Sequence, residues 1–317
     1  MADRRPARIV CLGVATLDQI FRIDRLPEPP AKVQALDFVV TGGGMAANAA
    51  VAVRRLGGEA AWWGRLGDDR VGDQILELLR AEAVDVTHVQ RLVGARSKTA
   101  AILIDGRGER LVVSAPAQGY PADTSWLPLA EIARYDAVLA DSRWKPGAFA
   151  VFEAAQHAGI PSVFDGDSGE PDEIRRIARA ATHPFLSESM LARYHRPVEQ
   201  ALIELFGGCN RVVGVTLGER GVCWFDGRSI HRSPAYRVAA VDTLAAGDTW
   251  HGALALALAE RQAVDDAIRF ASVTAALKCA RFGGRNGIPN RSEVEQTLAG
   301  WNSETGSGRT TVGPHSV

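Results

Sequence analysis

The strongest constraint on the fold is a repeated alternation between short apolar runs and segments with helical periodicity. Apolar runs typical of buried strands occupy residues 8–15, 59–67, 135–141, 160–167 and 209–218. Helical patterns lie between them, over residues 46–57, 72–82, 147–159 and 173–181. This alternation is typical of a parallel sheet with helices on both faces. We therefore predict an α/β fold whose ligand sites lie at the carboxyl ends of the strands.

Two stretches interrupt the alternation, because each resembles strands with no helix between them. They are residues 19–41 and 98–114, and the second includes a hairpin around Asp105–Gly108. Such strands can form a small sheet beside the main one, and a lid over the strand ends is its natural role. We expect one domain over residues 1–300 with these lid strands inserted, followed by a disordered polar tail at residues 301–317.

Composition narrows the classes of function. The 317 residues carry a formal net charge of −1, which favours neither nucleic acid nor an anionic membrane as a partner. We find no secretory signal and no apolar run of membrane-spanning length, so we expect a cytoplasmic protein. The four cysteines form no CxxC pair, which argues against a structural zinc site and against a disulfide framework.

The stretch VDTLAAGDTWHG, residues 241–252, places an acid near the start of an apolar helix. The small residues Ala245, Ala246 and Gly247 leave the first N–H groups of the helix uncovered, and the helix dipole adds positive charge there. Such a helix end binds anions. Asp248 lies beside it, where a carboxylate can accept a proton from a hydroxyl that attacks a phosphoryl group. Alternatively, Asp248 only favours the first turn through the dipole.

The stretch TGGGMAANAA, residues 41–50, has two functional interpretations. It matches G-x-G-x-x-A, the dinucleotide fingerprint of a Rossmann oxidoreductase. That fingerprint belongs after the first strand, however, and residues 8–15 already supply a first strand. Close approach of the backbone to a polar ligand fits better, with Gly43 lacking a side chain and Asn48 offering a donor and an acceptor. Tight packing between a strand and a helix is the structural alternative.

Two further stretches are weaker candidates for ligand contacts. Asp18 follows the first strand, where a carboxylate can hold two sugar hydroxyls, although solvation is the default role of a loop acid. VTLGERG, residues 215–221, is a strand that runs into a Gly-framed turn. It can contact a nucleotide or simply form a hairpin. The absence of a GxxxxGK[ST] motif argues against a P-loop kinase.

Taken together, these stretches resemble the ribokinase (PfkB-type) family of carbohydrate kinases over residues 8–300. VDTLAAGDTWHGALALAL resembles the C-terminal signature of that family, and GGGMAANAAVAVRRLGGEAAWWGRLGDDRVG resembles the N-terminal one. The resemblance implies a ribokinase-like fold with a β-sheet lid and transfer of the γ-phosphoryl group of ATP, with Mg²⁺, to a sugar hydroxyl. It also implies a homodimer joined through the lid strands.

The resemblance assigns roles to individual residues. It implies that Asp248 is the catalytic base and that the anion hole is formed by Ala245, Ala246 and Gly247. The residues implied to face the sugar are Asp18, Gly43 and Asn48. The implied contacts to ATP and its magnesium are Thr216, Gly218, Gly221, Ser187, Glu188 and Lys278. The N-x-x-E motif of the family is degraded here to LSESM at residues 186–190. Asp242, with the loop RFGGRNG at residues 281–287, is implied to hold a monovalent cation such as K⁺.

Within the family, residues 138–148, 163–169 and 276–289 resemble the sulfofructose kinases. In those enzymes a lid Lys, an Arg and an Asn recognise the sulfonate, and the matching positions here are Lys32, Arg143 and Ser114. An anion in a closing pocket needs charge-assisted donors. The implied reaction is phosphorylation of 6-deoxy-6-sulfofructose at O1. An uncharged sugar, as in ribokinases and fructokinases, is the alternative within the family. A Rossmann oxidoreductase and a non-catalytic sugar sensor are the alternatives outside it.

Overall fold

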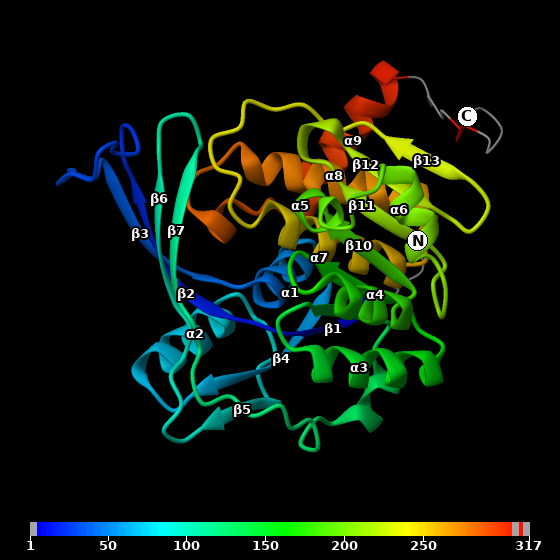
Figure 1. The fold of residues 1–317 in the computed structure, drawn as a ribbon, viewed down its shortest axis with the longest axis horizontal. Helices are drawn as coiled ribbons and strands as arrows, with labels where there is room; N and C mark the ends of the chain where they lie inside the picture. Colours follow the sequence, from blue (N-terminus) through cyan, green and yellow to red (C-terminus); the bar gives the residue numbers. More distant parts are fainter. Residues whose placement is uncertain (1–4, 306–310, 313–317) are drawn as a thin grey trace.

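The computed structural model describes residues 5–305 and residues 311–312. Within that range the main sheet has ten strands in the order β14-β13-β12-β11-β10-β9-β8-β1-β4-β5 (Figure 1). Strands β11 to β5 of this order pair in parallel, and the remaining three add in antiparallel fashion. The strands are β1 (Arg8–Leu12), β4 (Glu59–Gly67), β5 (Val89–Leu92), β8 (Ala137–Asp141), β9 (Ser162–Gly166), β10 (His183–Ser187), β11 (Val213–Thr216), β12 (Val222–Phe225), β13 (Ile230–Ser233) and β14 (Thr311–Val312). The predicted mostly parallel sheet is confirmed.

Helices cover both faces of this sheet, as predicted. One face carries α1 (Met45–Arg55), α2 (Arg70–Ala81), α7 (Ala246–Ala259), α8 (Val264–Cys279) and α9 (Arg291–Thr305). The other carries α3 (Lys145–Ala158), α4 (Pro171–Ala180), α5 (Glu188–Ala192) and α6 (Val198–Leu205). Short 3₁₀ turns are η1 (Leu129–Arg134), η2 (Gly218–Arg220) and η3 (Gly284–Gly287). No helix of the described chain is long and apolar enough to cross a membrane.

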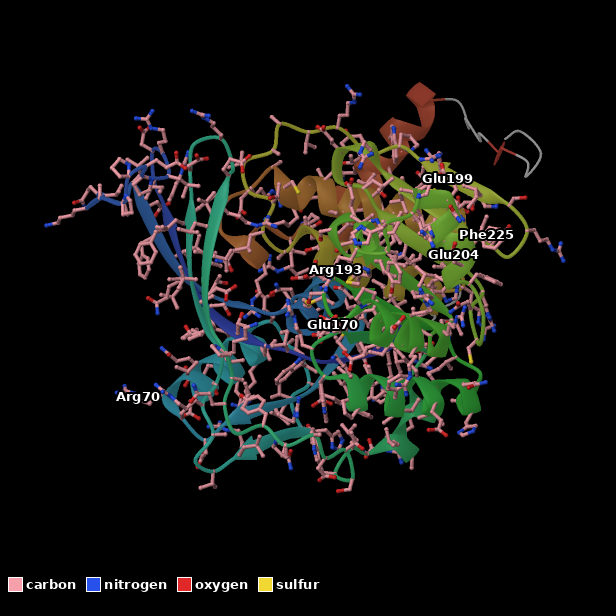
Figure 2. All side chains as sticks on the ribbon, in the orientation of Figure 1. Arg70, Glu170, Arg193, Glu199, Glu204 and Phe225 are labelled. Atoms are coloured by element: carbon pink, nitrogen blue, oxygen red, sulfur yellow. The ribbon has the colours of Figure 1, made fainter. Side chains whose placement is uncertain are left out.

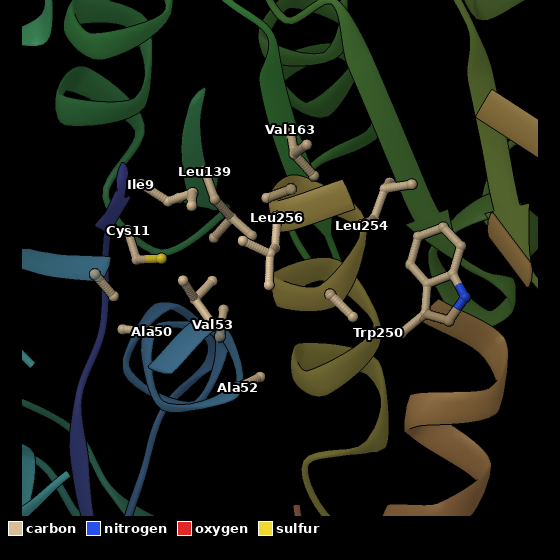
Figure 3. Packing of buried hydrophobic residues seen from close by; sticks show 14 of the residues in the cluster. Ile9, Cys11, Ala50, Ala52, Val53, Leu139, Val163, Trp250, Leu254 and Leu256 are labelled. Carbon is tan, nitrogen blue, oxygen red and sulfur yellow. The ribbon is translucent and has the colours of Figure 1, made fainter. Parts of the chain in front are cut away.

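The pleat of the strands divides the core into two clusters. In β1, Ile9 and Cys11 face the cluster under α1 and α7, whereas Val10 and Leu12 face the cluster under α3 and α4. Figure 3 shows the first cluster, where side chains of β1 lie among those of α1 and α7. Burying each large aliphatic side chain contributes about 1.5–3 kcal/mol, so the two clusters dominate the stability of the fold.

Surface charges contribute much less. Mixed acidic and basic side chains lie on and beside helices α4 to α6, including the labelled Glu170, which precedes α4, and Arg193, which follows α5 (Figure 2). Arg193 Nη2 and Glu170 Oε1 are 3.3 Å apart, and both side chains are largely exposed. Exposed pairs of this kind are worth about 0–1 kcal/mol each. The site is therefore positioned mainly by the packing of the core.

The lid is a separate four-stranded sheet in the order β3-β2-β6-β7 (Figure 1). Its strands are β2 (Thr16–Arg22), β3 (Asp37–Gly43), β6 (Thr99–Ile104) and β7 (Arg110–Ala115). The expected small sheet is confirmed, and the backbone N–H of Gly108 closes the hairpin on the carbonyl of Asp105 at 3.0 Å. The inner face of the lid packs Ile20, Ala100, Ile102 and Ile104 against Leu244 and Phe282.

Two details differ from the sequence-based expectations. Asp18 lies within strand β2 and not in a loop, because the lid begins only three residues after β1 ends. The chain is also ordered beyond residue 300, where we expected a disordered tail: α9 continues to Thr305. The cause is Trp301, which is buried and contacts the ring of Tyr236 at a centroid distance of 5.6 Å. Residues 311–312 pair with β13, and the rest of the expected tail lies outside the described residues.

Candidate active site

The candidate site lies at the carboxyl ends of the parallel strands, next to the lid. Asp141 ends β8, Asp165 lies at the end of β9, and Ser187 and Thr216 end β10 and β11. Ser187 and Thr216 are direct neighbours across the parallel pair. The N-terminus of α7 brings Asp248 to the same edge, where the charges of Asp167, Asp141 and Asp18 act on it. This is the edge where the sequence pattern predicts ligands.

The start of α7 presents uncovered N–H groups. Ala245 is the N-cap and has φ +64°, a left-handed conformation that is costly for a residue with a Cβ atom. The N–H of Ala246 donates to the carbonyl of Thr243 at 3.3 Å. Those of Gly247 and Asp248 meet no acceptor in the described chain, and a Cβ atom at Gly247 would meet nothing within 4 Å. Of the predicted set, Ala246 therefore uses its own N–H in the turn, and the N–H of Asp248 is an open donor in addition.

Asp248 is placed as a proton acceptor. Its Oδ2 accepts a hydrogen bond from Asn48 Nδ2 at 2.7 Å, which orients the carboxylate. Burial raises the pKa of Asp248 to about 6; the Asn48 hydrogen bond opposes this shift, and the Asp167, Asp141 and Asp18 carboxylates add to it. A pKa of that size leaves the group ionised at neutral pH and basic enough to accept a hydroxyl proton.

Asp18, Gly43 and Asn48 lie together, as predicted. A Cβ atom at Gly43 would lie 1.9 Å from Asp18 Oδ2, so only glycine permits this approach. Asp18 is buried and accepts a hydrogen bond from Thr16 Oγ1 at 2.6 Å. Asn48 joins the group through Asp248, and its Oδ1 is buried without a partner in the described chain. A hydroxyl of a ligand would satisfy that acceptor.

The structure also places a second buried pair beneath Asp248. His251 Nδ1 lies 2.8 Å from the Gly247 carbonyl and 3.4 Å from Asp165 Oδ2, and its Nε2 lies 3.2 Å from the Phe185 carbonyl. These contacts join the N-terminal half of α7 to β9 and β10. Burial raises the pKa of Asp165 well above its usual range, and the Asp248 carboxylate adds to that shift. No motif in the sequence pointed to this pair.

Only some of the residues predicted to contact ATP lie at positions that fit a nucleotide. Thr216 lies at the strand edge, and a Cβ atom at Gly218 would meet nothing within 4 Å, so both fit a nucleotide position. Ser187 is the N-cap of α5 and accepts from the N–H of Met190 at 3.2 Å. At Gly221, glycine is required by packing, because a Cβ atom there would lie 2.0 Å from the Ser233 carbonyl oxygen.

The predicted magnesium contacts form no metal cage. Glu188, at the start of α5, is paired with Arg220. Across the described residues, no group of three His, Cys, Asp or Glu side chains is placed to hold a metal ion. A magnesium ion that keeps most of its water and phosphate ligands is compatible with this arrangement, because Mg²⁺ is commonly bound through one or two carboxylates and the substrate phosphates.

Asp242 and Lys278 form one buried unit at the end of α8. The Lys278 side chain is fully buried, and its Nζ donates to the Asp242 carbonyl at 2.6 Å. The expected contact between Lys278 and ATP does not fit this position, because the side chain has no exposed surface. The sequence spacing could not reveal this, since the two residues are brought together only where α8 ends beside the turn that precedes α7.

The predicted anion-binding residues are only partly brought together. Ser114 pairs with Ala100, and Ala100 pairs with Asp18, so the three lie in one row on the inner face of the lid. Lys32 is exposed in the segment between β2 and β3, at the outer end of the lid (Figure 1), and no contact joins it to Arg143. Arg143 Nη2 lies 3.7 Å from Asp167 Oδ2.

Lys98 takes the position near Arg143 that Lys32 does not. It precedes β6, on the same lid face as Ala100, and its backbone carbonyl accepts from the N–H of Leu17 at 3.1 Å. Burial and the nearby Arg143 lower the pKa of Lys98, and Asp141 and Asp18 oppose this. Lys98 is one of four lysines in an arginine-rich chain, which is the sequence signal that could have found it.

Two other buried residues, Asp141 and Arg285, lie near Asp248 and Asp18. Asp141 accepts from the N–H groups of Val14 at 2.7 Å, Ala46 at 3.2 Å and Arg143 at 2.8 Å, which ties the start of α1 to β8. The Arg285 guanidinium lies against Gly42, where a Cβ atom would overlap it, and Asp18 is one of the charges that act on its pKa. The sequence analysis assigned neither residue.

Comparison with known proteins identifies the family and the fold of this chain. The pattern of the pfkB family carbohydrate kinases matches residues 6–291. The ribokinase of Bacillus subtilis is 29% identical over 300 residues, which cover 92% of this chain and 100% of that protein. Fructokinase-1 of Oryza sativa subsp. japonica is 28% identical over 297 residues, which cover 85% of this chain and 90% of that protein. The structure of Arabidopsis thaliana ribokinase complexed with ribose and ATP superposes with a TM-score of 0.79 at 25% identity, covering 92% of this chain and 98% of that one.

Proposed function

Because the chain belongs to the pfkB family of carbohydrate kinases and is an ATP-dependent sugar kinase, we propose the residue roles and the substrate class that follow. Asp248 accepts the proton of the attacking sugar hydroxyl. The open N–H groups of Gly247 and Asp248, at the positive end of α7, stabilise the charge that develops on the transferred phosphoryl group. The observation that carries this assignment is the raised pKa of a carboxylate beside uncovered N–H donors.

The remaining roles concern binding and exclusion of water. Asp18 and the free Oδ1 of Asn48 receive sugar hydroxyls, and Thr216 and Gly218 lie along the nucleotide. Mg²⁺, held mainly by the phosphates, supplies charge neutralisation when it is bound. The lid excludes water, which would otherwise compete with the sugar for the phosphoryl group.

We propose that the acceptor is a ketohexose with an anionic group, and that 6-deoxy-6-sulfofructose phosphorylated at O1 is the best candidate. The support is the pair of cations Lys98 and Arg143 beside Asp18, the carboxylate proposed to bind the sugar hydroxyls. Lys98 makes no side-chain hydrogen bond and no ion pair within the described chain, so an anionic ligand would complete its environment. Ser114 adds a hydroxyl on the same lid face.

A panel of acceptors tests both the activity and the substrate. ADP release is followed with 6-deoxy-6-sulfofructose, fructose, ribose and no sugar. We expect the highest kcat/KM with the sulfonated sugar. Lys98→Met should lower that value by about 10–100-fold, since a hydrogen bond to a charged group is worth about 1.5–3 kcal/mol, and should affect fructose much less. Lys32→Met is the matched control and should change neither value.

The second candidate is an uncharged sugar, because the curated relatives above are named ribokinase and fructokinase. Asp18 and Asn48 supply hydroxyl partners for either class of substrate. If fructose or ribose is preferred over the sulfonated sugar, or if Lys98→Met affects all sugars equally, the anionic-substrate proposal fails and the uncharged-sugar kinase stands. If none of the sugars in the panel causes release of ADP, the proposed acceptor class is contradicted.

We propose a homodimer that pairs the outer faces of the lid. That face exposes Phe38 and Val40 on β3 and Leu111 and Val113 on β7, the two edge strands of the small sheet. Phe21 and Leu103 lie between Phe38 and Leu111 in one cross-strand row, which makes the apolar surface continuous. Contiguous exposed apolar side chains mark an interaction surface. Sedimentation velocity should show a dimer for the unmodified chain and a monomer for Val113→Asp. A monomer in both cases would contradict the proposal.

A further inference from the structure

The buried ammonium of Lys278 occupies the place where the family resemblance implies a monovalent cation. Its Nζ lies 2.6 Å from the backbone carbonyl of Asp242 and 3.4 Å from Asp242 Oδ2. Both side chains are buried, with exposed fractions of 0% and 1%. The Lys278 ammonium and the Asp242 carboxylate therefore neutralise each other's charge inside the fold.

The remaining acceptors of Asp242 are also used. Oδ1 accepts from the N–H of Leu244 at 2.8 Å. Oδ2 accepts from the N–H groups of Gly283 at 3.0 Å and Gly284 at 2.8 Å. A K⁺ ion is held by oxygen atoms, whereas the groups that surround this carboxylate are N–H donors and an ammonium. A monovalent cation beside Asp242 does not fit while Lys278 is present, because the ammonium already contacts the carbonyl and Oδ2 oxygens that the cation would need.

We infer that the Lys278 ammonium replaces the monovalent cation, so that the kinase proposed above works without K⁺. An ammonium group matches K⁺ in charge and approximately in size. Here Lys278, in the last turn of α8, places such a group beside Asp242. The inference depends on the proposed function only for its activity measurement. Its thermal measurement is independent of any substrate.

The position of Lys278 explains how it acts on the reaction. The N–H groups of Val241 and Asp242 both donate to the Cys279 carbonyl, at 2.8 and 3.1 Å. Asp242 in turn holds the turn at Leu244, which leads directly into the uncovered start of α7. Lys278 is thus a positioning residue, because it fixes the segment that carries the open N–H donors and Asp248 without touching the substrate.

The test compares K⁺ with tetramethylammonium, which is too large for a buried site, at equal ionic strength. For the unmodified protein we expect the same melting temperature and the same kcat in both salts. A ligand that binds only the folded state raises its stability as its concentration increases. A melting temperature or a kcat that rises with K⁺ in the unmodified protein would overturn the inference.

Two variants make the test specific. Lys278→Ala removes the ammonium and leaves a space, and we expect it to lose activity in tetramethylammonium and to recover at least part of it with K⁺ or NH₄⁺. Lys278→Met fills the same space with an uncharged chain, and should lose activity with no recovery. Equal recovery of both variants, or recovery of neither, contradicts the replacement. If both fail to fold, the thermal comparison on the unmodified protein decides alone, even if no sugar substrate is found.

Discussion

Asp242 and Asp248 are six residues apart in one short stretch, yet their surroundings are opposite. Asp242 receives three backbone N–H groups and the Lys278 ammonium. Asp248 receives one side-chain donor, Asn48, and lies in the field of three other carboxylates. The first arrangement stabilises a fixed negative charge, and the second destabilises one.

The difference shows how one segment combines an anchor with a reactive group. The Asp242 carboxylate holds the chain in place, because every oxygen has donors. The Asp248 carboxylate is held by a single hydrogen bond, which leaves its proton affinity raised. The following predictions separate the two roles, beginning with the largest effect.

Asp248→Asn should lower kcat by about 10²–10⁴-fold, the usual contribution of a general base. Steady-state kinetics with the preferred sugar measures this loss. The same variant should be more stable than the unmodified protein at pH 8, because the raised pKa means that the folded state resists ionisation of this group. The gain should be full above pH 6 and should fade towards pH 4. Normal turnover in the variant would exclude Asp248 as the base.

Asp242→Asn should have the opposite effect on stability. It leaves the Lys278 ammonium buried without a counter-charge, which costs about 3–5 kcal/mol when one member of a buried pair is removed. Urea denaturation at pH 7 measures the loss. A change of less than about 1 kcal/mol, the value of an exposed pair, would show that the pair is not a stabilising anchor.

The pH dependence of kcat reports the Asp248 environment. Activity should fall tenfold per pH unit below pH 6, because the base must be deprotonated and burial raises its pKa to about 6. Asn48→Ala removes the hydrogen bond that opposes this shift, so the midpoint should move to higher pH. A midpoint that moves to lower pH would contradict the assigned contact.

Ala245→Gly should give the smallest effect. The left-handed conformation of Ala245 costs about 1–2 kcal/mol relative to glycine, and the greater flexibility of the unfolded glycine chain offsets roughly half of that. We expect a rise in melting temperature of about 1 °C, measured by thermal unfolding. A decrease would mean that the Ala245 Cβ atom makes a contact worth more than the strain.

Sequence patterns predicted the main sheet, the small second sheet and several residues that the structure brings together at the candidate site. Gly43, Asn48 and Asp248 could be located because each belongs to a stretch with a strong local pattern. Lys98, Arg285 and the Asp165–His251 pair could not, because the local pattern around each residue does not show what it contacts. Their importance depends on which other elements the fold places beside them.

The order of residues alone determined the alternation of strands and helices, the small residues before Asp248 and the glycine that admits Asp18. These are local features, set by periodicity and by the absence of side chains. Only the tertiary structure decided that Lys278 compensates Asp242 and that Lys98, in place of Lys32, accompanies Arg143. The physical reason is that charge interactions depend on distance and burial, and both arise when segments remote in sequence meet.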